Sequence, residues 1–263
     1  MRLTAVLLFL SITGIAVAQP NIGGVVNGAS FDKDEAIAPG SLVSIFGTKF
    51  AKATAAADSI PLSTSLGGVT VKFTNGSKSI DAPLLFANSE QINAVVPWEL
   101  VPSGVTANVG VEVSTSAGSS NSFTIAAKEF SPGIITVGGT LAAVQNTDGT
   151  LAQPPGSIAG RTTHPAAPGE VIVIYTTGLG PVNPSVPDGH IPPSGTLART
   201  LHIPFVSIGG HSAHVEFSGL SPQFVGVYQL NVTVPNVTGD NLEVQLSLGG
   251  ITTLKGVTMA VSQ

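Results

Sequence analysis

The feature that most constrains this chain of 263 residues is a pair of motifs that each occur twice. Gln91–Pro97 reads QINAVVP, and Gln229–Pro235, 138 positions later (229 − 91), reads QLNVTVP. Upstream, Ala38–Phe46 (APGSLVSIF) matches Ala167–Tyr175 (APGEVIVIY) at an offset of 129 (167 − 38). The same motifs in the same order at similar spacing predict a duplicated structural unit. The offsets differ by nine residues (138 − 129) because the second copy has the longer loop, Gly180–Thr200.

Both copies have the residue pattern of β-strands. Five stretches alternate apolar and polar residues, the period-two pattern of a strand with one buried face: Leu42–Phe46, Val69–Phe73, Val109–Ser114, Phe205–Ile208 and Leu242–Leu248. Between the strands lie pairs that tolerate the positive φ of tight hairpin turns: Asn75-Gly76, Asp148-Gly149, Gly209-Gly210 and Gly249-Gly250. We therefore predict an all-β chain, with one short surface helix at residues 51–58 as the sole exception.

The residues of the repeated motifs suit the beginning and the end of a β-strand. Ala-Pro-Gly begins a strand, because proline lacks the amide that a central ladder needs and glycine permits the preceding turn. In Gln-x-Asn-x-x-Val-Pro, the Gln and Asn share one strand face and the proline ends the pairing. We expect the Gln and Asn side chains to hydrogen-bond neighbouring loop backbone, with direct ligand contact as the alternative.

We expect the fold to be two tandem immunoglobulin-like β-sandwich domains after an N-terminal signal peptide. The signal peptide is assigned to residues 1–18, the first domain to 19–130 and the second to 131–263. The boundary near Glu129–Pro132 follows one predicted strand and precedes the next. This linker is short and contains proline, which favours a fairly rigid pair.

The first 18 residues have the layout of a cleaved export signal. Met1-Arg2 precedes the apolar stretch Leu3–Val17, and Ala16-Val17-Ala18 offers a small-x-small cleavage site before Gln19. The stretch is shorter than the roughly 20 residues that a stable membrane span needs. A buried N-terminal helix is the alternative.

Composition excludes several classes of protein. Removing Arg2 leaves nine Lys and Arg against fifteen Asp and Glu, a net charge of −6 with no basic block, so we expect no nucleic-acid partner. The chain has no cysteine, which excludes disulfides, thiolate zinc sites and cysteine nucleophiles. Only 10% of the residues are charged, unlike a disordered chain.

These motifs resemble the secreted acidobacterial family known as the Solibacter uncharacterised C-terminal domain. The resemblance covers essentially the whole chain after the signal peptide and rests on Val26–Ser30, Ile37–Gly47, Gln91–Trp98, Val173–Pro181 and Leu197–Arg199. It implies secretion and a pair of β-sandwiches, without an established activity. Each half also resembles, more loosely, the immunoglobulin-like fold shared by plexins and transcription factors, which argues for fold alone.

None of the candidate catalytic or metal-binding motifs in the sequence is complete. Gly210–His214 approaches the G-x-S-x-G nucleophile elbow, but Ser212 lies in a predicted hairpin instead of a strand-to-helix turn. His202, His211, His214 and Glu216 are close in sequence, yet a strand face brings together only the last two, and zinc needs three or four ligands. Residues 32–35 and 146–149 could offer oxygen ligands to calcium, but neither segment has the full set of regularly spaced carboxylates of a known calcium-binding loop. We assign no catalytic, cofactor-binding or metal-ligating residue and no cofactor.

Two features favour binding. Trp98 is the sole tryptophan, and its counterpart in the second copy is Asn236, so the fold itself does not require an aromatic residue there. Packing at the domain junction or over the first core is the alternative to a ligand platform. The long loops at residues 48–66 and 180–200 follow equivalent strands and should emerge from the same end of each sandwich. The candidate binding residues are Trp98, Asp188, His190 and Arg199.

We therefore expect a non-catalytic module, secreted or on the cell surface and not membrane-spanning, for adhesion or interaction. Its partner would be envelope polysaccharide or another extracellular protein. The alternative is a structural subunit that builds a surface layer or filament through sheet edges. The charges of Lys72 and Lys78 would keep one hairpin edge from pairing with another subunit. The uncharged strand Val257–Val261 is the edge expected to pair with a strand of another subunit.

Overall fold

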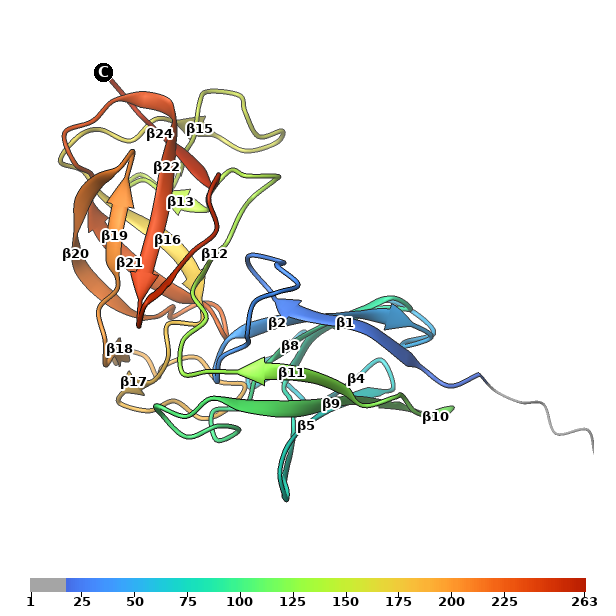
Figure 1. The fold of residues 1–263 in the computed structure, drawn as a ribbon. Coiled ribbons are helices and arrows are strands. Elements are labelled where there is room, and N and C mark those ends of the chain that lie inside the picture. The colour runs from blue at the N-terminus through green and yellow to red at the C-terminus, as the bar shows by residue number, and fades with distance from the viewer. Residues whose placement is uncertain (1–17) are drawn as a thin grey trace, which may run out of the picture.

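A computed structural model describes residues 18–263, and over this range the chain consists of strands, turns and loops with no helix (Figure 1). The predicted signal peptide thus lies, except for Ala18, outside the described residues. None of the described residues form a helix long and apolar enough to cross a membrane. We call residues 19–130 the first half and residues 131–263 the second half.

The first half contains two antiparallel sheets. One has the order β1-β2-β8-β7-β3, and the other has the order β10-β9-β5-β4, with β11 also on β9 and β6 also on β5. The strands are β1 (Asn21–Asn27), β2 (Leu42–Thr48), β3 (Ala55–Ala56), β4 (Ser65–Leu66), β5 (Val69–Asn75), β6 (Lys78–Asp81), β7 (Leu84–Ala87), β8 (Gln91–Val95), β9 (Ala107–Thr115), β10 (Gly118–Ser119) and β11 (Phe123–Ala127).

The second half forms a continuous set of paired strands in the order β15-β14-β13-β16-β21-β20-β19-β22-β23. In addition, β12 pairs with β16, β18 with β17 and β20, and β24 with β22. The strands are β12 (Gly133–Ile134), β13 (Val144–Gln145), β14 (Leu151–Ala152), β15 (Thr163–His164), β16 (Val171–Thr177), β17 (Val182–Asn183), β18 (Arg199–Thr200), β19 (Phe205–Ile208), β20 (His211–Leu220), β21 (Tyr228–Thr233), β22 (Gly239–Leu248), β23 (Ile251–Thr252) and β24 (Thr258–Val261).

The buried apolar side chains form one cluster in each half. Alternate residues of each central strand point inward, so that Val43 and Ile45 of β2 enter the first cluster and Ile172 and Ile174 of β16 enter the second. Tyr228 is fully buried in the second cluster, and its hydroxyl donates a hydrogen bond to the Gly180 carbonyl (2.6 Å). A tyrosine hydroxyl placed in a core needs such an acceptor.

The repeated motifs make the same backbone contacts in both halves. In each Ala-Pro-Gly turn the glycine has a positive φ, +74° at Gly40 and +81° at Gly169. The Gly40 N–H donates to the Val96 carbonyl (2.8 Å), and the Gly169 N–H donates to the Val234 carbonyl (2.9 Å). The turn therefore starts β2 beside β8 and β16 beside β21 in the same way.

The five predicted strand stretches and the hairpin turns between them are confirmed. Gly209-Gly210 and Gly249-Gly250 both have positive φ at each position, as a tight hairpin turn requires. The predicted helix at residues 51–58 is wrong. Instead, Ala55–Ala56 forms β3 and pairs with β7, because eight residues without a cap are too few for a stable helix and pairing with the sheet satisfies the backbone.

The predicted outward-pairing edge at Val257–Val261 is also wrong. Met259, Ala260 and Val261 of β24 are buried. One side of β24 pairs with β22. On the other side, the N–H groups of Ala142 and Ala166 donate to the carbonyls of Thr258 and Ala260 (2.9 and 3.0 Å). Because both sides of β24 are paired, it has no free row of backbone N–H and C=O groups with which another chain could pair.

The two halves are joined by buried polar contacts at a seam. Thr177, the last residue of β16, is fully buried there; its hydroxyl accepts the N–H of Leu42 (2.8 Å) and donates to the carbonyl of Gly226 (2.7 Å). The side-chain amide of Asn27, also fully buried, donates to the Ser131 carbonyl (2.8 Å). Figure 1 shows the chain leaving β11 beside this seam and rising into the second half.

Replacing Thr177 by valine should destabilise the protein by about 2–4 kcal/mol, since it leaves the Leu42 N–H and the Gly226 carbonyl without their partner. Chemical denaturation followed by tryptophan fluorescence measures the change.

The matched control is Thr176→Val. Thr176 is equally buried, but its hydroxyl has no hydrogen-bond partner among residues 18–263. Replacing it by a methyl group should therefore be neutral or stabilising by up to about 1 kcal/mol. Equal losses of stability in the two variants would show that the two hydrogen bonds of the Thr177 hydroxyl do not stabilise the fold.

Candidate functional site

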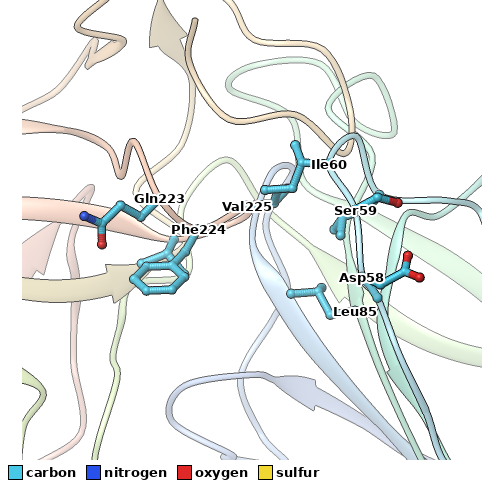
Figure 2. A pocket seen from close by; sticks show the side chains of 10 residues that line it. Asp58, Ser59, Ile60, Leu85, Gln223, Phe224 and Val225 are labelled. Atoms are coloured by element: carbon cyan, nitrogen blue, oxygen red, sulfur yellow. The ribbon is translucent and has the colours of Figure 1, made fainter. Parts of the chain in front are cut away.

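A cleft of about 570 Å³ lies between the two halves (Figure 2). The first half contributes residues 57–60, Leu62 and Leu85, and the second half contributes residues 223–225 and Val227. Ile60 and Phe224 are large apolar side chains that are 47% and 52% exposed. Figure 2 shows Gln223 and Phe224 on one side, Asp58 and Ser59 on the other, and Ile60 and Val225 between them. The cleft thus has apolar walls and a polar rim.

The two predicted long loops meet beside this cleft. The N–H of Leu62, in the loop of the first half, donates a hydrogen bond to the carbonyl of Gly189, in the loop of the second half (2.9 Å). A side chain at Gly189 would approach the Leu62 carbonyl oxygen to 3.0 Å, so the two backbones pack closely. The two long loops therefore contact each other directly.

The outer face of the second-half sheet continues from Phe224. The Phe224 ring packs edge to face against Tyr175 of β16, with centroids 6.2 Å apart. The Tyr175 hydroxyl donates to Gln145 Oε1 of β13 (3.1 Å), and burial raises the pKa of Tyr175. Gln229 of β21 lies directly across from Tyr175 in the sheet. Aromatic and amide side chains therefore extend away from the cleft along one sheet face.

The predicted contact of the repeated Gln and Asn with loop backbone is wrong. Gln229 Nε2 donates to Asn231 Oδ1 (3.0 Å), and Gln91 Nε2 donates to Asn93 Oδ1 (2.8 Å). The two side chains of each motif lie on the same face of one strand, two residues apart, which brings them within reach of each other. Each motif thus forms its own amide pair.

Trp98 lies at the seam, half-buried, and packs against the second hydrophobic cluster. Its indole covers Gly40, where a Cβ atom would come within 2.1 Å of the ring. The Trp98 backbone N–H donates to Asp188 Oδ1 (2.9 Å). The indole also borders a depression of about 500 Å³ that is separate from the cleft and includes Glu99 and Pro181. The packing interpretation of Trp98 therefore agrees with its surroundings.

The other candidate binding residues are divided between two places. Asp188 is half-buried beside Trp98; burial raises its pKa, and the nearby Glu99 carboxylate acts in the same direction. His190 is exposed, and its Nδ1 lies 2.9 Å from the Asp188 carbonyl oxygen. Arg199 of β18 instead stacks its guanidinium over the Phe217 ring, 4.8 Å from the centroid. The structure therefore groups Trp98, Asp188 and His190, while Arg199 packs on its own sheet.

The hydrolase-like segment forms the predicted hairpin. Ser212 of β20 lies directly across from Ser207 of β19. His214 Nε2 lies 3.8 Å from Glu216 Oε2, and the other Glu216 oxygen accepts a hydrogen bond from Thr233 (2.9 Å). Within residues 18–263, no three His, Asp or Glu side chains come together as a metal site requires.

The carboxylates considered for calcium bind internal donors. Asp148 accepts the backbone N–H and the hydroxyl of Thr150 (2.9 and 2.6 Å), and its second oxygen lies 2.9 Å from His164 Nε2. Thr147 of the same turn donates its backbone N–H and its hydroxyl to Glu170, which lies outside the turn (2.9 and 3.0 Å). In the other turn, Lys33 pairs with Asp34.

The cleft residues Ile60 and Phe224 were not among the sequence-based candidates. Both lie in loops without periodicity, so no sequence pattern indicates whether either side chain is buried or exposed. The one available signal was the position of Phe224 between two turn-forming segments, Ser221-Pro222 and Gly226, directly before a repeated motif. Only the packing of the two halves brings it opposite Ile60.

No family model matches the chain, and no curated protein matches it by sequence. The resemblance to the acidobacterial family therefore stays a sequence-based hypothesis.

Solved structures give distant matches only. A plexin A4 extracellular region is 13% identical (TM-score 0.25; 98% of this chain, 20% of that chain). A surface glycan-binding protein from Prevotella bryantii is 12% identical (TM-score 0.25; 92% and 43%). A complex of Dpr2 Ig1-Ig2 with DIP-Theta Ig1-Ig3 is 9% identical (TM-score 0.22; 90% and 98%). This chain spans less than half the length of the first two. At these TM-scores the likeness carries no conclusion about ligand or partner.

The Asp148–His164 pair should make stability depend on pH. Hydrogen bonding to Asp148 raises the pKa of His164 above 6.5, and hydrogen bonds from Thr150 and His164 lower the pKa of Asp148 below 3.8. The His164 contribution is therefore complete below pH 6.5 and lost as the pH rises through the raised pKa. The Asp148 contribution is complete above pH 3.8 and lost as the pH falls through the lowered pKa.

Thermal unfolding at about pH 5 and about pH 9 tests this pair. His164→Gln should lower the melting temperature more at the lower pH, where the native histidine is charged. The control is His211→Gln, because the His211 side chain is exposed and makes no hydrogen bond within the described range. Its effect on the melting temperature gives the baseline for removing an exposed imidazole. A His164→Gln effect that does not change with pH would contradict the assignment.

Proposed function

We propose that this chain is an exported, non-catalytic interaction module that binds envelope polysaccharide in the cleft between its two halves. The proposal includes the signal peptide at residues 1–18 and two immunoglobulin-like sandwich domains divided near residue 130. The observation that carries it is the cleft of about 570 Å³, with exposed apolar walls and a polar rim contributed by both halves.

The chemistry of the cleft matches a sugar chain. A pyranose ring has apolar C–H faces and hydroxyl groups around its edge, so its site needs flat apolar contact together with hydrogen-bonding groups at the side. Phe224 supplies an aromatic face, and Ile60 supplies aliphatic contact. The side chains of Asp58, Ser59 and Gln223 make no hydrogen bond with any other described residue, so they are available to ligand hydroxyls.

The two tied loops support a preformed site. The Leu62–Gly189 hydrogen bond fixes one wall of the cleft relative to the other half, and Val225 and Val227 of the opposite wall are buried. Rigid walls reduce the ordering cost of binding. A non-catalytic role is proposed because the cleft residues include a single titratable side chain, Asp58, and because the hydroxyl of Ser59 is not hydrogen-bonded to it as an activated nucleophile would be to its base.

Phe224→Ala should weaken polysaccharide binding about tenfold, because a ring contact of this kind contributes up to about 1.5 kcal/mol. Affinity gel electrophoresis of residues 19–263 in soluble β-glucan, xylan and mannan, together with a printed glycan array, measures the effect.

The matched control is Phe205→Ala, a phenylalanine of β19 that is 56% exposed and does not line the cleft. It should leave binding unchanged. Equal effects of the two substitutions on binding would show that the cleft is not where the polysaccharide binds. Retention of the native protein on no glycan would overturn the polysaccharide proposal, and capture of a secreted protein by native but not Phe224→Ala protein would then identify the cleft as a protein-binding site.

A further inference from the structure

Each half carries an aromatic and amide cluster on the outer face of a sheet. We define the second platform as Tyr175, Phe224, Gln229 and Asn231, which adjoins the cleft. The first platform consists of Phe31, Phe46, Gln91 and Asn93. In each platform two aromatic rings contact each other, with centroids 6.2 Å apart for Tyr175–Phe224 and 6.5 Å for Phe31–Phe46.

The strand positions of the two platforms are equivalent by the sequence repeat. Tyr175 lies across from Gln229, and Phe46 lies across from Gln91. Phe46 and Tyr175 are related by the offset of 129, and the amide residues are related by the offset of 138. The second ring of each pair comes from a non-equivalent loop. Both halves thus expose an aromatic pair beside a Gln–Asn pair, although they reach it with different loops.

The amide pairs leave matching atoms unused. Within each pair, Gln Nε2 donates to Asn Oδ1, while Gln Oε1 and Asn Nδ2 make no hydrogen bond with any other described residue. A free acceptor next to a free donor can bind two neighbouring hydroxyl groups, since each hydroxyl both donates and accepts. Both pairs are half-buried, so these atoms remain accessible to a ligand.

The first platform is held in a strained conformation. Phe31 has a φ of +57°, a region that a bulky residue rarely adopts, and the residue is 52% exposed. The Phe31 N–H donates to the Asn27 carbonyl (3.0 Å), and Asn27 Oδ1 accepts the N–H of Ala29 (2.9 Å). Strain of this kind persists where the surrounding structure imposes it and concentrates at functional sites. Here it keeps an apolar ring in solvent beside Phe46.

The two platforms lie within reach of one ligand. Leu42 begins β2 and contacts Thr177, the end of β16, at the seam. Phe46 lies four residues from Leu42, and Tyr175 lies two residues from Thr177. At about 3.3 Å per residue, the two aromatic residues are no more than about 25 Å apart. A sugar chain of several units spans this distance.

We propose that the first platform is a second glycan site, so that one polysaccharide chain occupies both halves at once. The inference rests on the proposed function and extends it to a bivalent mode of binding. Aromatic rings stack on pyranose faces, and the adjacent amides bind the hydroxyls of the same sugar unit. Because linked sites raise the affinity for a long ligand above that of either site alone, a ligand that reaches only one platform binds more weakly.

The test compares Phe46→Ala, Tyr175→Ala and the double variant in affinity gels containing soluble β-glucan, xylan or mannan, with thermal unfolding of each variant as the folding check. Either single variant should weaken binding to the retarding polysaccharide by about 10- to 100-fold, and the double variant should not bind. Phe46→Tyr, which gives the first platform the ring found in the second, should weaken binding far less than Phe46→Ala does. Phe205→Ala should also leave binding unchanged.

A trisaccharide of the same glycan separates two sites from one composite site. Each single variant should bind it within about twofold of native affinity, as observed by titration in NMR spectra, because the remaining platform is independent. Native affinity for the polysaccharide in Phe46→Ala, combined with loss in Phe224→Ala, would overturn the second site and leave the proposed function intact. Failure of the native chain to bind any glycan would overturn both.

Discussion

The arrangement of the whole molecule depends on how one hydroxyl group is shared at the seam. Thr177 accepts the first N–H of β2 and donates to the carbonyl of Gly226, so it joins the start of a strand in one half to the loop before a strand in the other. Because this hydroxyl is fully buried, water cannot replace either bond. Strands β2 and β16, which carry one aromatic residue of each platform, and the Gly226 segment of the cleft wall all meet at this point.

Much of the strand content could be predicted from the sequence, because alternation such as that of Leu42–Phe46 follows directly from burial of one face. The short helix at residues 51–58 could not be excluded, since the competing strand β7 offers its pairing only through tertiary structure. The same limit applies to Val257–Val261. Its lack of charge indicated an open edge, but the segments around Ala142 and Ala166, far away in sequence, cover it.

The candidate site was harder to predict than the fold. Trp98 and Asp188 were identified as residues of interest, and they do contact each other, but the structure gives the indole a packing partner in Gly40. Phe224 and Ile60, which form the cleft, carry no sequence pattern that distinguishes them from buried loop residues. The Gln and Asn of the repeat were recognised as a pair on one face, yet their mutual hydrogen bond depends on side-chain conformations that no spacing specifies.

The contacts at the seam also have a consequence for the energetics of any ligand that touches both halves. Asn27 with Ser131, Leu42 with Thr177, Leu62 with Gly189 and Trp98 with Asp188 hold the halves at four places. Two halves on a flexible tether would lose rotational entropy each time a ligand bridged them. Here that loss has already occurred during folding, so association with an extended ligand does not have to supply it again.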